Sequence, residues 1–152
     1  MTAPEVVAEL VRRGETVATC ESLTGGLVAA ELTSVPGSSA VVRGGLVTYA
    51  TDLKTSLAGV AAEVVASHGV VSREVAAAMA RGARRACGAS WGIGLTGVAG
   101  PDPVDGLPPG TVCLAVAGPG GVVSVLERFE GDRGAVRRAS VVAALQLLHD
   151  QW

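Results

Sequence analysis

The only lysine in the sequence is the residue whose type most strongly suggests catalysis. The other eleven basic residues of the sequence, besides Lys54, are arginines, so this chain uses arginine wherever a simple surface cation is enough. Arginine keeps its proton at physiological pH, whereas a desolvated lysine can lose its proton and act as a general base. Lys54 is therefore a candidate base, and a solvated helix residue is an equally good interpretation from the sequence alone.

A serine at the end of a β-branched run offers a partner for that base. Ser22 follows the predicted buried strand 16–20 and precedes Thr24, Gly25 and Gly26. Main-chain N–H groups at a glycine-rich helix start can hold an anion or a developing oxyanion. Ordinary capping of a helix by Ser22 or Thr24 explains the same spacing, and spacing alone favours capping.

A nearby hydroxyl adds to the hypothesis of acyl transfer. Tyr49, the only tyrosine, lies five residues before Lys54, at the end of another predicted strand. A serine–lysine pair with a hydroxyl close by is a known arrangement for acyl transfer without histidine.

Other chemistries have weaker support. A thiol site would rest on Cys20, which ends an apolar run where cysteine is usually inert packing. The sequence has two histidines, His68 and His149, but no G-x-S-x-G elbow, so a histidine-activated serine is poorly supported. No cluster of His, Cys and carboxylate residues has metal-ligand spacing, and we expect no metal and no cofactor. Residues 92–97 match G-x-G-x-x-G, but these glycines fall inside a predicted strand, which favours close packing over dinucleotide binding.

The segments that must position these residues alternate between helix and strand. Apolar periodicity and capping residues predict helices over 4–13, 27–32, 51–57, 73–87 and 133–150. Strands are predicted over 16–20, 41–50, 91–96, 111–117 and 122–129, the last two forming a hairpin. The pattern predicts an α/β protein, a three-layer α/β/α sandwich in which helices cover both faces of a mixed sheet.

Length and charge restrict the class of protein. With 152 residues, 49% of them hydrophobic, the chain fits a single domain over residues 1–152. The net charge of −2 argues against a nucleic-acid partner. The charge-free stretch 107–126 contains prolines and glycines that favour two strands and a turn over a membrane span. The N-terminal residues do not resemble a signal peptide and the cysteine count is odd, so we expect a cytoplasmic protein. The apolar hairpin would suit a homo-oligomer.

Eight short blocks occur in an order and at a spacing that closely resemble the CinA C-terminal-domain family, the nicotinamide-nucleotide amidases. The resemblance runs from about residue 3 to residue 151. The blocks are Glu-Ser-Leu-Thr-Gly-Gly at 21–26, Pro-Gly-Ser-Ser at 36–39, Gly-Leu-Val-Thr-Tyr at 45–49, Lys54, His-Gly-Val-Val-Ser at 68–72, Thr-Gly-Val-Ala-Gly-Pro at 96–101, Pro-Gly-Thr-Val at 109–112 and Gly-Asp-Arg at 131–133.

The resemblance implies a reaction and a set of site residues. It implies hydrolysis of the carboxamide of nicotinamide mononucleotide to nicotinic acid mononucleotide and ammonia, in bacterial pyridine-nucleotide recycling, without metal or cofactor. Ser22 corresponds to the nucleophile, Lys54 to its base, and Tyr49 and Thr96 to supporting hydroxyls. Thr24, Gly25 and Gly26 are candidate oxyanion donors. Candidates for binding the rest of the nucleotide, its phosphate included, are Arg137, with Arg133 as its substitute, and Ser38, Ser39, Gly97 and Gly100.

The sequence departs from the family pattern at two places. Leu23 stands where the family usually has cysteine, and residues 102–108 hold fewer glycines than the family loop, which bears on substrate fit. Larger relatives also carry an N-terminal domain, whose activity the resemblance does not extend to this sequence. Two other functions stay open: a non-catalytic nucleotide-binding regulatory module of the same fold, and a thiol-dependent hydrolase that uses Cys20.

Overall fold

A five-stranded sheet forms the middle layer of the protein, as seen in a computed structural model that describes all 152 residues. The strand order is β2-β1-β3-β4-β5. β2, β1 and β3 run parallel, whereas β4 is antiparallel to β3 and β5 is antiparallel to β4, so the predicted mixed sheet is confirmed. The strands are β1 (Val17–Glu21), β2 (Val42–Val47), β3 (Trp91–Gly97), β4 (Thr111–Gly118) and β5 (Gly121–Arg128).

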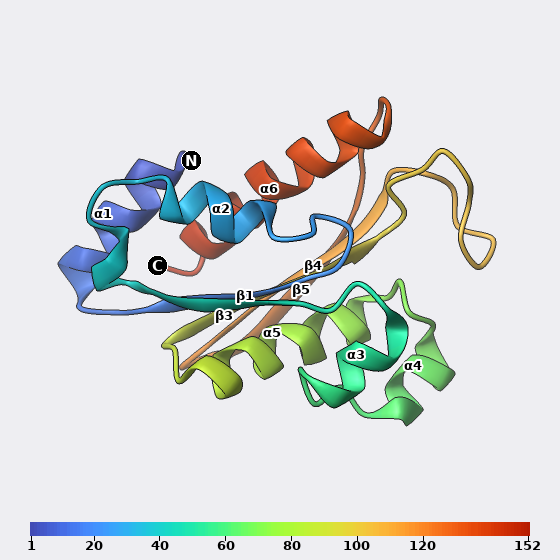
Figure 1. Cartoon of the computed structure of the whole chain (residues 1–152), viewed down its shortest axis with the longest axis horizontal. Coiled ribbons are helices and arrows are strands. Elements are labelled where there is room, and N and C mark those ends of the chain that lie inside the picture. The colour runs from blue at the N-terminus through green and yellow to red at the C-terminus, as the bar shows by residue number, and fades with distance from the viewer.

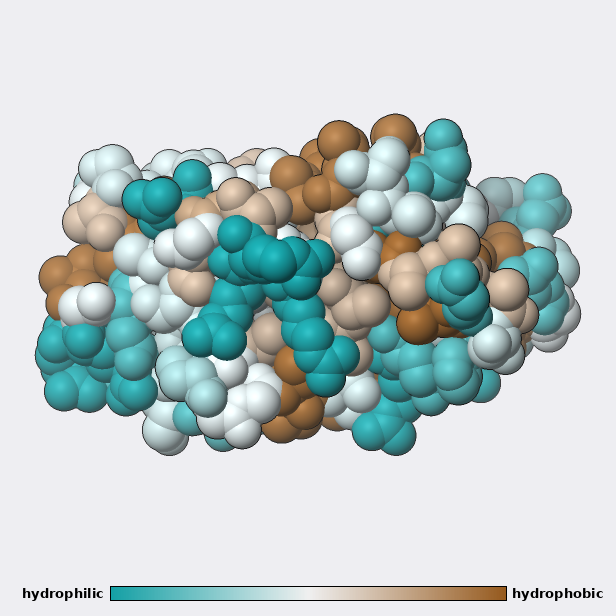
Figure 2. Space-filling view, turned by 90° about the horizontal axis from the view of Figure 1, so that it is seen from below, coloured by the Kyte–Doolittle hydropathy of each residue, from teal (hydrophilic) through white to brown (hydrophobic).

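Helices cover both faces of this sheet, which confirms the predicted three-layer sandwich (Figure 1). One outer layer holds α1 (Ala3–Arg13), α2 (Leu27–Thr33) and α6 (Arg133–His149). The other holds α3 (Thr51–Ser56), α4 (Ala62–His68) and α5 (Arg73–Cys87), and a short 3₁₀ turn, Ser38–Ala40, precedes β2. Seen from the side of α3, α4 and α5, the surface carries a band of hydrophilic side chains near its middle (Figure 2).

The two faces of the sheet differ in side-chain size. Beneath α1, α2 and α6 the strands present large residues such as Ile93, Leu95 and Leu114, whereas beneath α5 they present mainly alanine, cysteine and glycine. A Cβ on Gly94 would collide with the carbonyl oxygen of Ala76 in α5 and lie 2.6 Å from the nitrogen of Ala80. Gly92 and Gly94 of the G-x-G-x-x-G match therefore let α5 pack closely on β3, which confirms the packing interpretation.

The strand predicted over 41–50 is shorter in the structure, where β2 ends at Val47. The N–H of Thr48 donates to the carbonyl oxygen of Glu21 at 2.9 Å, which is the last link to β1. The carbonyl oxygen of Thr48 accepts a hydrogen bond from Lys54 Nζ instead of from another strand. The chain therefore leaves the sheet at this point and enters α3, the helix that carries Lys54.

The charge-free stretch 107–126 forms most of the β4–β5 hairpin, as predicted. No helix of the protein combines the length and the apolar character that crossing a membrane requires.

Candidate active site

A cavity of about 410 Å³ opens where the carboxyl ends of β1, β2 and β3 meet. The crevice outside the carboxyl ends of parallel strands is the usual ligand site of open α/β sheets. Ser22 follows β1, Tyr49 follows β2 and Gly97 ends β3, so three segments that are distant in sequence reach the same cavity. The lining residues are Ser22, Leu23, Tyr49, Thr51, Lys54, Val70, Val71, Thr96, Gly97, Val98, Ala99, Gly100, Pro101, Asp102, Val104 and Arg133.

Ser22 and Lys54 are in direct contact within this cavity. Lys54 Nζ lies 3.1 Å from Ser22 Oγ, and the lysine is 1% exposed. The amine also donates to two main-chain carbonyl oxygens, that of Thr48 at 2.6 Å and that of Tyr49 at 3.4 Å. No ion pair of the protein involves Lys54, so the buried amine has no counter-ion.

This environment favours the neutral form of the amine. Burial lowers the pKa of Lys54, and this effect is larger than the opposing effect of Cys20. A neutral amine has two N–H donors and one lone pair. Because two carbonyl oxygens take the two N–H groups, the lone pair remains for the hydroxyl proton of Ser22. The geometry therefore suits a general base acting on a serine nucleophile.

The turn between Ser22 and α2 lies where the sequence predicts it, with the helix starting after the two glycines. α2 begins at Leu27, and Gly25 and Gly26 hold left-handed conformations before it. Gly25 was predicted to be an oxyanion donor. Its N–H is not free in the structure, because it donates to the carbonyl oxygen of Ser22 at 3.0 Å. The N–H groups of Leu23, Thr24 and Gly26 have no acceptor in the protein, and of these three residues Leu23 lines the cavity.

Arg133 and Tyr49 meet at the mouth of the cavity. Arg133 donates to the carbonyl oxygen of Gly100 at 2.8 Å and to the hydroxyl of Tyr49 at 3.0 Å. Thr96 lies deeper, where its hydroxyl donates to the carbonyl oxygen of Val70 at 2.8 Å. Tyr49 and Thr96 thus line the cavity, but neither hydroxyl contacts the Ser22–Lys54 pair, which differs from the supporting role expected of them.

Six predicted binding residues do not line the cavity, namely Thr24, Gly25 and Gly26 of the turn, and Arg137, Ser38 and Ser39. Arg137 donates from Nε and Nη2 to the carbonyl oxygens of Leu23 and Thr24, at 3.0 and 3.3 Å, so it braces the turn that follows Ser22. Ser38 and Ser39 precede β2, at the opposite end of the parallel strands from Ser22, roughly 16 Å of strand away. Within one chain they do not join the other site residues.

The thiol is poorly placed for nucleophilic chemistry. Cys20 is buried beside the hydroxyl of Thr48, and burial raises its pKa, which disfavours the reactive thiolate. It does not line the cavity.

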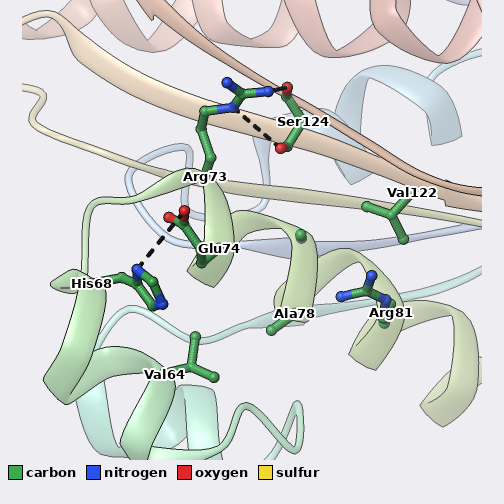
Figure 3. Close-up of a pocket in the computed structure, with 9 residues that line it drawn as sticks. Val64, His68, Arg73, Glu74, Ala78, Arg81, Val122 and Ser124 are labelled. Carbon is green, nitrogen blue, oxygen red and sulfur yellow. Dashed lines mark hydrogen bonds and ion pairs between the residues drawn. The ribbon is translucent and has the colours of Figure 1, made fainter.

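A second cavity, of about 480 Å³, lies between α4, α5 and β5 (Figure 3). There Arg73 is bonded to Ser124, and His68 lies 3.8 Å from Glu74. It holds no serine or cysteine paired with a base, so it offers no nucleophilic chemistry.

The site and the fold can be compared with those of known proteins. The family model described as "CinA C-terminal domain" matches residues 1–152. The chain belongs to the CinA C-terminal domain family. The CinA-like protein of Anaeromyxobacter dehalogenans strain 2CP-1 is 55% identical over 144 residues, which are 94% of this chain and 35% of that protein. The CinA-like protein of Frankia casuarinae is 49% identical over 143 residues, 94% of this chain and 33% of that protein.

Solved structures of CinA proteins share the fold. The competence/damage inducible protein CihA from Agrobacterium tumefaciens has a TM-score of 0.93 and 38% identity, over 97% of this chain and 92% of that one. A CinA superfamily protein from Escherichia coli has a TM-score of 0.96 and 29% identity, over 99% and 88%. This chain spans about a third of the length of the curated CinA relatives that it matches.

Directly before the nucleophile of the CinA site lies a buried acid that had no role in the sequence prediction. Glu21 is fully buried, and its carboxyl group accepts the N–H groups of Val28 and Ala29 at the start of α2. A signal was present: α2 begins after Gly26, which has no side chain to cap a helix, so an acceptor had to come from elsewhere.

Proposed function

We propose that this chain hydrolyses the carboxamide of nicotinamide mononucleotide to nicotinic acid mononucleotide and ammonia. The single observation that carries the proposal is the contact between Ser22 Oγ and a buried lysine amine that has no counter-ion. The resemblance of the sequence to the nicotinamide-nucleotide amidases supplies the substrate. The reaction would serve pyridine-nucleotide recycling in the cytoplasm, and neither step below uses a metal or a cofactor.

Acylation begins when Ser22 Oγ attacks the amide carbon while Lys54 Nζ accepts the hydroxyl proton. The carbonyl oxygen becomes an oxyanion, for which the candidate donors are the free N–H of Leu23 in the cavity lining and those of Thr24 and Gly26 in the same turn. Lys54 then gives its proton to the amide nitrogen, the C–N bond breaks and ammonia leaves. In deacylation, Lys54 takes a proton from water, the hydroxide attacks the ester, and the proton returns to Ser22 Oγ.

The mouth of the cavity suits the phosphate of the nucleotide. A volume of about 410 Å³ is within the range of small-molecule sites. Arg133 is the cation at the mouth, while Lys54 acts as a base deeper in the cavity. The Tyr49 hydroxyl and the Gly100 carbonyl that now accept from Arg133 are neutral groups, so a phosphate would compete well for the guanidinium.

Ammonia release tests the proposal directly. Purified protein is incubated with nicotinamide mononucleotide, and ammonia and nicotinic acid mononucleotide are quantified against a blank. Saturable binding of the nucleotide without ammonia release would instead support the non-catalytic regulatory module. Absence of both would refute the choice of substrate.

Removal of the thiol should leave the enzyme active. Because Cys20 lies outside the cavity, we expect Cys20→Ala to keep kcat within about threefold of the parent value. Ammonia release and inactivation by iodoacetamide are measured on both proteins. A thiol-dependent hydrolase would lose essentially all turnover in the variant.

Removal of the mouth cation should weaken substrate binding. We expect Arg133→Met to raise KM for nicotinamide mononucleotide about tenfold with little change in kcat, which corresponds to about 1.4 kcal/mol of lost binding. Nicotinamide riboside, which has no phosphate, should be turned over equally by both proteins. Arg138→Met, on the same helix but outside this cavity, is the matched control and should behave like the parent. Equal losses on both substrates would contradict a phosphate role.

A further inference from the structure

Glu21, a buried acid directly before the nucleophile, accepts three hydrogen bonds through its carboxyl group. One carboxyl oxygen accepts the N–H of Val28 at 2.9 Å, and the other accepts the N–H of Ala29 at 3.0 Å and the hydroxyl of Thr19 at 3.1 Å. The residue is 0% exposed, and none of the ion pairs includes it. Burial of an acid without a cation is costly, so these hydrogen bonds are needed to keep it inside the protein.

α2 has no local side-chain cap. Gly26 holds a left-handed conformation in which a serine, threonine or aspartate would be strained, whereas the caps Asp132 of α6 and Ser72 of α5 have extended backbones. Here the cap comes from the last residue of β1 and spans the whole Ser22–Gly26 turn. Glu21 therefore links the end of β1 to the start of α2 and restrains the distance between the two ends of the turn.

The turn needs such a restraint because it has little stability of its own. Gly25 and Gly26 both adopt left-handed conformations, and glycine is the most flexible residue in an unrestrained chain. Arg137 holds the carbonyl oxygens of Leu23 and Thr24 from one side, and Glu21 fixes the far end at α2. Both contacts leave the free N–H groups of the turn unoccupied.

We infer that Glu21 is a positioning residue for the oxyanion site: its carboxyl group holds the Ser22–Gly26 turn so that the free N–H groups of the turn face the carbonyl oxygen of the bound amide. The inference rests on the proposed amidase function. It assigns Glu21 no contact with substrate and no proton to transfer. Its effect reaches the reaction only through the geometry of the turn.

The test is Glu21→Gln, which keeps the size of the side chain but replaces one accepting oxygen with a donor facing an N–H group. Because a small misplacement of oxyanion donors is costly, we expect kcat for nicotinamide mononucleotide to fall about 30-fold with KM unchanged within about twofold. The second substrate is the thioamide analogue, whose sulfur is a poor hydrogen-bond acceptor. The ratio of amide to thioamide rates should fall about fivefold or more in the variant, because the parent gains more from its donors.

The rate ratio separates positioning from a general structural role. A variant that is merely less folded loses both rates in proportion, so an unchanged ratio would overturn the inference. Glu31→Gln makes the same chemical change on the exposed side of α2 and should match the parent in kcat and in the ratio. Circular dichroism and thermal melting confirm the folded fraction of each protein.

A second variant keeps the test informative if Glu21→Gln fails to fold. Thr19→Val removes only the hydroxyl that donates to the Glu21 carboxyl group and preserves side-chain shape. We expect a loss of about threefold in kcat and a smaller decrease in the rate ratio. If the parent is active and the folded variants keep its ratio of amide to thioamide rates, the positioning role of Glu21 is overturned and the proposed function stands. A parent that releases no ammonia overturns the proposed function, and this inference with it.

Discussion

Replacement of Lys54 by arginine is expected to reduce ammonia release from nicotinamide mononucleotide by at least about a thousandfold, because arginine keeps its proton and cannot serve as a base. In the parent, the amine of Lys54 lies 3.1 Å from Ser22 Oγ and has no counter-ion. A permanent cation at this position would stabilise the ground state without accepting the serine proton. The measurement is the initial rate of ammonia release, with the fold of each variant checked by circular dichroism.

Two further variants sharpen this prediction. Lys54→Met replaces the buried amine with an apolar side chain of similar size, so it should fold at least as well as the parent and be equally inactive. Ser22→Ala should reach the same residual rate, and the double variant should lose no more than either single one, because residues that act as a unit are not additive. Independent, additive losses would show that the two residues do not work together. Retention of full rate by either single variant would end the Ser–Lys mechanism.

The dependence of rate on pH follows from the same burial. Burial lowers the pKa of Lys54, and the base must be neutral to act. The value of kcat/KM should therefore rise with pH as the amine loses its proton and should level off below the ordinary lysine pKa of about 10.4. A midpoint at or above that ordinary value would contradict a desolvated base.

The presence of Lys54 in the cavity could be anticipated because it is the only lysine of the sequence, whereas the groups that bond to its amine could be found only from the structure. A single lysine among eleven arginines and a serine after an apolar strand are local signals. The two carbonyl oxygens that orient the amine are main-chain atoms, so no residue type reports them. Arg133 and Arg137 are equivalent by type and lie one helical turn apart, and only the packing of α6 decides that Arg133 faces the cavity.

Substitution of Gly94 by alanine is expected to destabilise the fold by about 3 kcal/mol or more, or to prevent folding. The new Cβ would collide with the carbonyl oxygen of Ala76 and lie 2.6 Å from the nitrogen of Ala80 and 3.1 Å from the Cβ of Met79. These are main-chain or near-main-chain atoms of α5, so a rotamer change cannot relieve the overlap. The free energy of unfolding in urea measures the effect.

The matched control lies on the neighbouring part of the same sheet. A Cβ on Gly44 in β2 would lie 3.5 Å from Cys87 Sγ, which is ordinary van der Waals contact. Gly44→Ala should therefore be neutral or slightly stabilising, because alanine restricts the unfolded chain. If both substitutions cost the same, the close approach of α5 to β3 would not be the cause.

The fold was more accessible to sequence reasoning than the site. Each strand and helix has its own apolar pattern, and the glycines inside 91–97 already indicated close packing. Ser38 and Ser39 show the limit, because their polar composition resembles a binding loop while the parallel order of β1 and β2 carries them to the far end of the sheet. Direction along a strand is a property of topology, which short motifs do not encode.

The loop after β3 has a consequence for how this protein and its relatives can diversify. Val98 donates to Thr111 at 2.8 Å and accepts from Gly110 at 2.7 Å, so the chain leaves and rejoins the sheet at one fixed point. Residues 101–109 form a wall of the cavity, through Pro101, Asp102 and Val104, and make no hydrogen bond to the side chain of Ser22 or Lys54. A chimera that exchanges only this segment would keep the nucleophile and base and present a different wall to the substrate. One wall of the cavity and the Ser22–Lys54 pair thus lie on separable stretches of chain, and a library confined to nine residues could vary that wall while holding the pair constant.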